Sequence, residues 1–342
     1  MHLKSGLKAL RFRSRVATAE TIYLNGPATL RVRGKLLVFE PIDGKPQTLH
    51  PKTIRRIVVV GYADVSGVAF GLLWRHKIEV VFVSPTMDRV VARVSPGAVP
   101  TSLTYCQYNA CQDPNFGLDR ARDLIAAKSV ATQEASRYYQ RQGRAEFADQ
   151  VTRLTKKAPA LLRKAESLNA VRGIEGSIAA AWWKRFRSMI DPDWSFRQRQ
   201  FHPAPDPVNA MLSFGYTLLL GRADTLLTVA GLDVRQGFLH THRPGRASLA
   251  CDVIEPFRIP VVDRTVVKLL RRRQVKLSDF DCHEGERCSM SVAAKNQLVN
   301  GLEERLAKQE QAELIALIER TRRQIRDHAK GQSIDPSDME VH

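Results

Sequence analysis

The stretch ATLRVRGKLLVFEP, residues 28–41, indicates β-structure in the first part of the chain. Its apolar residues are mainly Val, Leu and Phe and partly alternate with polar ones, which is typical of short strands. Four similar segments are separated by Gly, Pro, Asn and Asp: TIYL (21–24), IRRIVVVG (54–61), KIEVVFVSP (77–85) and RVVARVSP (89–96). Ser66 is placed to cap one helix among them. We therefore predict a small β-sheet domain over residues 1–96, which contains this one helix.

Apolar residues recur at helical spacing farther along the chain. In FGLDRARDLIAAKSVATQEASRYYQRQ, which begins at Phe116, four residues fall on or near one face: Leu118, Leu124, Ile125 and Lys128. Similar patterns follow in ESLNAVRGIEGSIAAAWWKRFRSMI and DPVNAMLSFGYTLLLGRADTLLTVAG. The spacing predicts a mainly helical domain over residues 116–330.

Two further segments complete the predicted organisation. Residues 97–115 carry turn residues and show little clear period, so we expect a linker there. The last residues, 331–342, are polar and are expected to form a flexible tail. A chain of 342 residues is long enough for two domains. The predicted fold class is α+β: a small N-terminal β-sheet domain followed by a larger all-α helical domain that carries the catalytic residues.

The chain is strongly basic. It has 53 Lys and Arg residues against 35 Asp and Glu, which gives a formal net charge of +18. The positive residues are distributed along the chain rather than gathered in a tail. Such a surface attracts polyanions, and nucleic acid is the leading candidate because each neutralised phosphate releases counterions.

Several common signals do not occur in the sequence. There is no apolar run of signal-peptide or membrane-span length, so we expect a cytoplasmic protein without a membrane partner. Five cysteines, an odd number, favour reduced thiols over a disulfide framework. The absence of G-x-x-x-x-G-K-[ST] and G-x-G-x-x-G motifs predicts no nucleotide cofactor.

Two carboxylates, Asp252 and Glu255, are three residues apart in HTHRPGRASLACDVIE, residues 240–255. If Ser248 caps a helix that begins at Leu249, they share a face, and a divalent metal ion could use such a pair. The alternative is a surface acidic pair that forms an ion pair with a nearby arginine, Arg258 or Arg264. Pro256 follows directly and constrains the direction of Glu255.

His240 and His242 precede the turn RPGR, in which Arg243 and Arg246 offer planar donors for phosphate oxygens. A histidine nitrogen beside carboxylate oxygens suits a transition ion such as Mn²⁺, and Mg²⁺ can be accommodated. Either histidine could be the ligand. A surface or hydrogen-bonded histidine is the plainer alternative.

Glu175 stands among small residues in VRGIEGSIAAAWWKRF. Its neighbours Gly173 and Gly176 each lower helix stability by about 1 kcal/mol relative to Ala. Small residues around a carboxylate let another backbone, or a phosphate with its metal ion, come close. A tightly packed helix crossing, with Glu175 at its solvent-exposed edge, explains the small residues equally well.

Three segments carry a resemblance to a known family. RGIEG (172–176), DPVNAMLSFGYTLL (206–219) and GLDVRQGFLHTHRPGRASLACDVIEPFRIPVVDR (231–264) resemble, in this order and spacing, the CRISPR-associated adaptation endonucleases, the "Cas-one" integrases. The third segment is long and specific. A β-rich N-terminal domain followed by a helical domain is also the layout of that family, so the resemblance covers most of the chain.

The resemblance implies a metal-dependent DNA endonuclease and integrase that inserts short DNA fragments into a CRISPR array as part of antiviral defence. Glu175, His240 and Glu255 fall where the family has its ligands for Mg²⁺ or Mn²⁺, and Asp252 falls on a further acidic position near the site. In the family the 3′-hydroxyl of the incoming DNA attacks a phosphodiester. This transesterification conserves bond energy, in agreement with the missing nucleotide motifs.

The resemblance also implies partners. The family acts as homodimers, and two of them flank a dimer of a small second adaptation protein, "Cas-two", in a heterohexamer that binds double-stranded and forked DNA. The β-sheet domain is then the expected dimerisation platform.

Two other functions fit part of the sequence. HTHR at 240–243 satisfies the H-x-x-R box of tyrosine recombinases, but their nucleophile lies downstream and the last tyrosine here is Tyr216. An architectural DNA-binding protein without catalysis would explain the charge. It would not explain Glu175, Asp252 and Glu255, because carboxylates repel DNA unless a cation bridges them.

Overall fold

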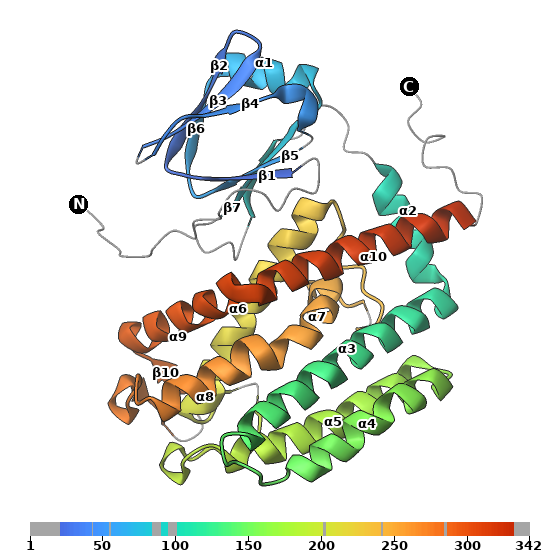
Figure 1. Ribbon diagram of the computed structural model, residues 1–342, viewed down its shortest axis with the longest axis vertical. Helices are drawn as coiled ribbons and strands as arrows, with labels where there is room; N and C mark the ends of the chain where they lie inside the picture. Colours follow the sequence, from blue (N-terminus) through green and yellow to red (C-terminus); the bar gives the residue numbers. More distant parts are fainter. Residues whose placement is uncertain are drawn as a thin grey trace.

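The computed structural model describes residues 21–42, 44–54, 56–83, 90–94, 101–200, 203–240, 242–283 and 286–331. The strands of residues 21–94 gather at one end of the molecule and the long helices at the other (Figure 1). This arrangement confirms the predicted α+β class, in which a small β-rich region precedes a larger helical one. None of the helices in the described ranges combines the length and apolar character of a membrane span.

The β-rich region contains two four-stranded sheets, with the orders β1-β5-β7-β8 and β4-β3-β2-β6. The strands are β1 (Thr21–Asn25), β2 (Ala28–Arg33), β3 (Leu36–Pro41), β4 (Gln47–Leu49), β5 (Arg56–Val60), β6 (Ala63–Val65), β7 (Glu79–Val83) and β8 (Val90–Val94). The quoted stretch 28–41 forms the antiparallel pair β2 and β3. Strands β5 and β7 are parallel, and the crossover connection that such a pair requires runs through β6 and the helix α1 (Gly67–Arg75).

The predicted cap of α1 is confirmed. The Ser66 side chain accepts a hydrogen bond of 3.2 Å from the backbone N–H of Ala69, and it thereby satisfies one of the free donors at the start of the helix. Leu72 and Leu73 of α1 are buried with Leu30 and Ile57 of the two sheets. The β-rich region therefore has an apolar core of its own.

The helical region is built from long helices, a few short turns and one two-stranded ribbon. They are α2 (Thr101–Gln112), α3 (Pro114–Gln140), α4 (Ala148–Lys164), α5 (Leu168–Ser188), η2 (Pro192–Trp194), α6 (Pro207–Ala230), α7 (Ser248–Ile254), η3 (Glu255–Phe257), η4 (Arg258–Asp263), α8 (Arg264–Arg271), η5 (Leu277–Asp279), β9 (Phe280–Asp281), β10 (Ser289–Met290), α9 (Val292–Arg305), η6 (Leu306–Glu310) and α10 (Gln311–Gly331).

Helix α6 lies in the interior of this region. Apolar residues surround it on nearly every side, which is typical of a helix buried within a domain. It contacts α7, α9 and α10, while α3 packs against α4 and α5 and against the turn η3 (Figure 1). The segment η4, which follows η3 directly, contacts both α3 and α6, so the α7–η3–η4 segment lies between these two helices.

The predicted linker differs from the structure, because residues 101–112 form α2. Leu103, Cys106 and Ala110 of this helix are buried in the helical core. Their spacing is helical, but polar residues surround them in the sequence and hide the pattern. The side chain of Gln107 is also buried and donates to the backbone oxygens of Asp233 (2.8 Å) and Gln236 (3.1 Å). The predicted flexible tail lies outside the described residues from position 332 onward.

The cysteine prediction is wrong at one place. Cys282 and Cys288 form a disulfide, whereas Cys106, Cys111 and Cys251 are free thiols. The reason is local, because the antiparallel pair β9 and β10 brings the two cysteines opposite one another.

Candidate active site

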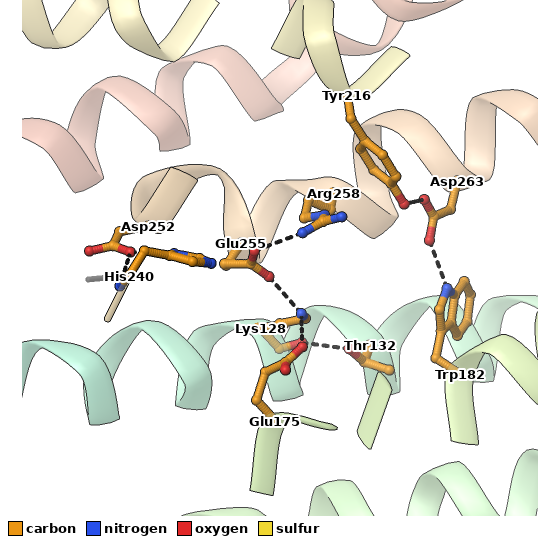
Figure 2. Close-up of polar contacts among 10 residues, drawn as sticks. All are labelled: Lys128, Thr132, Glu175, Trp182, Tyr216, His240, Asp252, Glu255, Arg258 and Asp263. Carbon is orange, nitrogen blue, oxygen red and sulfur yellow. Dashed lines mark hydrogen bonds and ion pairs between the residues drawn. The ribbon is translucent and has the colours of Figure 1, made fainter. Parts of the chain in front are cut away.

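Three elements bring charged side chains to one point. Lys128 of α3 donates one hydrogen bond to the carboxylate of Glu175 on α5 and another, of 2.6 Å, to Glu255 Oε2 (Figure 2). The side chain of Glu175 is 27% exposed, against 9% for Lys128 and 5% for Glu255. Glu175 therefore forms the solvent-facing edge of this cluster, and Glu255 its floor.

Pro256 directs Glu255 as its chemistry predicts. Proline lacks a backbone N–H and disrupts the preceding turn, so α7 ends at Ile254 and Glu255 begins the tighter turn η3. Arg258 Nη1 donates to Glu255 Oε1 at 2.8 Å. Burial alone would raise the pKa of Glu255, but the charges of Arg258 and Lys128 outweigh it and lower the pKa to about 2. Glu255 is therefore a buried, ionised carboxylate.

The reading of Asp252 and Glu255 as a surface acidic pair is wrong, because both side chains are buried. That reading did identify Arg258 as the partner of Glu255. The helix start also differs slightly from the prediction. Ser248 is the first residue of α7, and its neighbour Ala247 occupies the cap position without a side-chain hydrogen bond.

Asp252 connects α7 to the preceding loop. Its carboxylate accepts backbone hydrogen bonds from Phe238 (2.6 Å), Leu239 (2.9 Å) and His240 (2.9 Å). Gly237 permits this close approach, because a Cβ there would lie 2.8 Å from Asp252 Oδ2. The loop is thus folded around one carboxylate.

The same carboxylate orients His240. His240 Nδ1 lies 2.6 Å from Asp252 Oδ1, and the ring extends from Asp252 toward Glu255 (Figure 2). A carboxylate at Nδ1 favours the tautomer with its proton on that nitrogen, so Nε2 carries the lone pair. His242 and Arg243 are exposed and Arg246 is half-buried. Geometry therefore favours His240 over His242 as a ligand.

The residue types that meet at this site fit a divalent cation. Among the residues that the structure describes, no three His, Cys, Asp or Glu side chains are close enough to bind a metal ion. Instead, the ammonium group of Lys128 stands between Glu175 and Glu255. Two carboxylates and an imidazole whose second nitrogen is held by a carboxylate are donors that Mg²⁺ and Mn²⁺ use.

Sequence reasoning overlooked the role of Lys128. It placed this lysine on an apolar helix face but assigned it no partner. A lysine on such a face is a signal for a buried carboxylate, since lysine is almost never fully buried unless it is paired. The partners lie 47 and 127 residues away, so no local pattern identifies them.

A second buried polar group supports the floor of the site (Figure 2). Asp263 accepts hydrogen bonds from Tyr216 O–H and from Trp182 Nε1–H, the latter at 2.7 Å. The guanidinium of Arg258 lies over the Tyr216 ring, 4.3 Å from its centroid. Arg258, which holds Glu255, is therefore itself held by the Tyr216 ring.

Asp263 makes stability depend on pH. Burial raises its pKa to about 6, although hydrogen bonds from Tyr216 and Trp182 and the charges of Arg258 and Arg199 oppose the shift. Its pKa in the unfolded chain is near 3.9. Because the folded state binds this proton more tightly, the resulting stability is fully present below the unfolded pKa and is lost as pH rises through about 6.

We therefore expect the free energy of unfolding of the wild type to fall by about 1 kcal/mol more than that of Asp263→Asn between pH 5 and pH 7.5. Urea unfolding of both proteins at the two pH values measures the difference. Parallel changes in the two proteins would contradict the role of Asp263.

Comparison with known proteins supports one family. A sequence model described as CRISPR associated protein Cas1 matches residues 22–304. The CRISPR-associated endonuclease Cas1 2 of Rhodospirillum rubrum is 34% identical over 299 residues, which cover 83% of this chain and 86% of that protein.

Solved structures share the fold. "Casposase bound to integration product" has a TM-score of 0.74 at 24% identity, and the match covers 84% of this chain and 87% of the casposase chain. "Partial Cas6-RT-Cas1--Cas2 complex" has a TM-score of 0.72 at 21% identity, and the match covers 93% of this chain and 97% of the chain in that structure. Together with the family match, these findings confirm the resemblance carried by the three motifs, and this chain belongs to the Cas1 family of CRISPR-associated proteins.

Proposed function

We propose that this protein is a divalent-metal-dependent DNA endonuclease and integrase that inserts short DNA fragments into a CRISPR array by transesterification. The observation that carries the proposal is the convergence of Glu175 and Glu255 around one cation, beside a histidine that Asp252 orients. The relative in Rhodospirillum rubrum is named an endonuclease, and the casposase was solved with an integration product.

Glu175, Glu255 and Nε2 of His240 would hold the Mg²⁺ or Mn²⁺ ion. When bound, the ion supplies Lewis acidity at the scissile phosphate and helps to activate the attacking hydroxyl. Asp252 holds the proton on His240 Nδ1 and thereby keeps Nε2 available. Arg258 keeps Glu255 ionised and fixes its orientation. Each protein group thus has a role before the ion arrives.

Arg243 and Arg246 would bind DNA phosphates from the loop between His240 and α7. Arg243 is exposed and Arg246 is half-buried. Guanidinium groups bind phosphate oxygens through two parallel hydrogen bonds. Their position a few residues from His240 would bring the DNA backbone to the proposed ion.

The proposed assembly is a homodimer that joins the small second adaptation protein, Cas2, in a heterohexamer and binds double-stranded and forked DNA. The β-rich domain, residues 1–96, would form the dimer contact. Large apolar side chains exposed on this domain support that role: Ile42 (72%), Tyr62 (71%) and Trp74 (66%). One solved structure of the same fold is described as a Cas1--Cas2 complex.

A joining assay tests the proposal. The purified protein is mixed with Cas2, a labelled double-stranded fragment with free 3′-hydroxyl ends, and a supercoiled plasmid that carries a CRISPR repeat. We expect the label to enter the plasmid with Mg²⁺ or Mn²⁺, and no joining with excess chelator. If the protein binds DNA but neither joins nor cleaves it with either metal, it is an architectural DNA-binding protein instead.

A further inference from the structure

Lys128 has an unusual position for a lysine. Its side chain is 9% exposed, and both hydrogen bonds of its ammonium group go to carboxylates, those of Glu175 and Glu255. These are two of the three groups that we propose as metal ligands. The ammonium nitrogen therefore lies where the two carboxylates converge, which is the place that a shared cation would take (Figure 2).

The two cations of the cluster are held differently. Arg258 is anchored twice, by its hydrogen bond to Glu255 and by its contact with the Tyr216 ring. The backbone of Lys128 is also fixed, since Thr132 Oγ1 donates to the Lys128 carbonyl at 2.7 Å. The long, flexible side chain of Lys128, in contrast, ends on the two carboxylates alone among its hydrogen-bond partners in the described structure. Lys128 is therefore the cation that can move.

Charge balance limits what the cluster can hold. Glu175 and Glu255 carry two negative charges, and Lys128 and Arg258 carry two positive ones. A divalent ion on the same carboxylate oxygens would stand within a few ångströms of the ammonium group, and the two cations would repel each other strongly in this partly buried setting. The lysine and the ion therefore compete for one place.

We propose that Lys128 is a built-in counter-cation that holds Glu175 and Glu255 together in the metal-free protein and gives up its place when the divalent ion binds. It is a positioning residue, since it acts on the ligands and not on the DNA. This inference rests on the proposed function, because it takes these carboxylates as the metal site. Glu175 is the more exposed of the two, so the ammonium group leaves past that side.

Lys128→Met tests the inference, because methionine keeps an unbranched chain of similar length without charge. We expect Mn²⁺ to bind about tenfold more tightly to Lys128→Met than to the wild type in titration calorimetry, since the competing cation is gone. Without metal, the melting temperature of the variant should be lower, because the carboxylates then repel each other. Mn²⁺ should raise that temperature more in the variant than in the wild type.

Lys156→Met is the matched control. Lys156 is an exposed lysine on α4, so its replacement makes the same change of net charge away from the cluster. It should leave Mn²⁺ affinity unchanged. Equal or weaker Mn²⁺ binding by Lys128→Met, relative to the wild type, would overturn the inference.

A measurement on the wild type covers the case in which Lys128→Met does not fold. Lysine acylation, read by mass spectrometry of the peptide that contains Lys128, should increase several-fold when Mn²⁺ is added, because the displaced ammonium group becomes exposed. Unchanged or reduced labelling would overturn the inference.

Glu175→Gln separates this inference from the proposed function. If Glu175→Gln binds Mn²⁺ as tightly as the wild type does, the metal site lies elsewhere and the proposed site fails. If Glu175→Gln loses Mn²⁺ but Lys128→Met gains nothing, only the role of Lys128 fails.

Discussion

Glu175→Gln is expected to reduce strand joining by about a thousandfold or more while the protein still folds and binds DNA. Loss of one charged ligand removes several kcal/mol of stabilisation of charge in the transition state, and about 4 kcal/mol corresponds to a thousandfold in rate. Glutamine keeps the shape and one oxygen of the side chain. Because Glu175 is partly exposed and its described hydrogen bond is with Lys128, we expect its replacement to leave the core intact. The rate of label transfer into the repeat plasmid measures the effect.

Glu166→Gln is the matched control for this variant. Glu166 is an exposed carboxylate between α4 and α5, and its replacement changes the net charge equally. Joining by Glu166→Gln should equal that of the wild type, and both variants should bind the labelled fragment with wild-type affinity. Joining by Glu175→Gln at the wild-type rate would remove Glu175 from the proposed site.

Local patterns in the sequence predicted several strands of the β-rich region and the start of its helix α1. Alternating apolar residues identified the segments that become β2, β3, β5 and β7, and the hydroxyl of Ser66 identified the start of α1. The arrangement of the strands in two sheets was not predicted. Which strands pair depends on contacts between residues far apart in the sequence, as in the pairing of β1 with β5.

Helix α2 was missed for a related reason. The buried side of this helix consists of Leu103, Cys106 and Ala110. Two of these side chains are small, and the Tyr, Gln and Asn residues between them obscure the helical spacing. The helix is stabilised by packing on the helical core and by the contact of Gln107 with the loop near Asp233. Tertiary contacts of this kind outweigh weak intrinsic preferences.

The candidate site shows the same limit. Carboxylates, histidine and arginines could be identified as types that bind metal ions and phosphates, and the family motifs indicated which of them to choose. The contact of Lys128 with Glu175 and Glu255 joins three distant segments, and no spacing rule predicts it. The hydrogen bonds that Asp252 accepts come from backbone groups, whose direction depends on the folded loop.

Asp252→Asn is expected to lower the free energy of unfolding by about 3 kcal/mol or more and to reduce joining by about a hundredfold. The fully buried carboxylate accepts three backbone N–H groups and contacts His240 Nδ1. An amide has one oxygen fewer, and its NH₂ group would face the same donors without a hydrogen bond. The loop would then lose its anchor, and His240 would lose the acceptor that fixes its tautomer. Urea unfolding and the joining assay measure the two effects.

Asp233→Asn distinguishes this role from a general loss of charge, because Asp233 lies at the start of the same loop. Its carboxylate accepts hydrogen bonds from Tyr108 O–H (3.0 Å) and from the backbone N–H of Arg235 (2.9 Å). Both hydrogen bonds are exposed, so water can take the place of the carboxylate as the acceptor. We expect a loss of about 1 kcal/mol and joining close to that of the wild type. Equal effects of Asp233→Asn and Asp252→Asn on joining would mean that joining depends on the stability of the whole loop and not on the contact between Asp252 and His240. A much larger loss with Asp252→Asn would instead assign the effect to the orientation of His240.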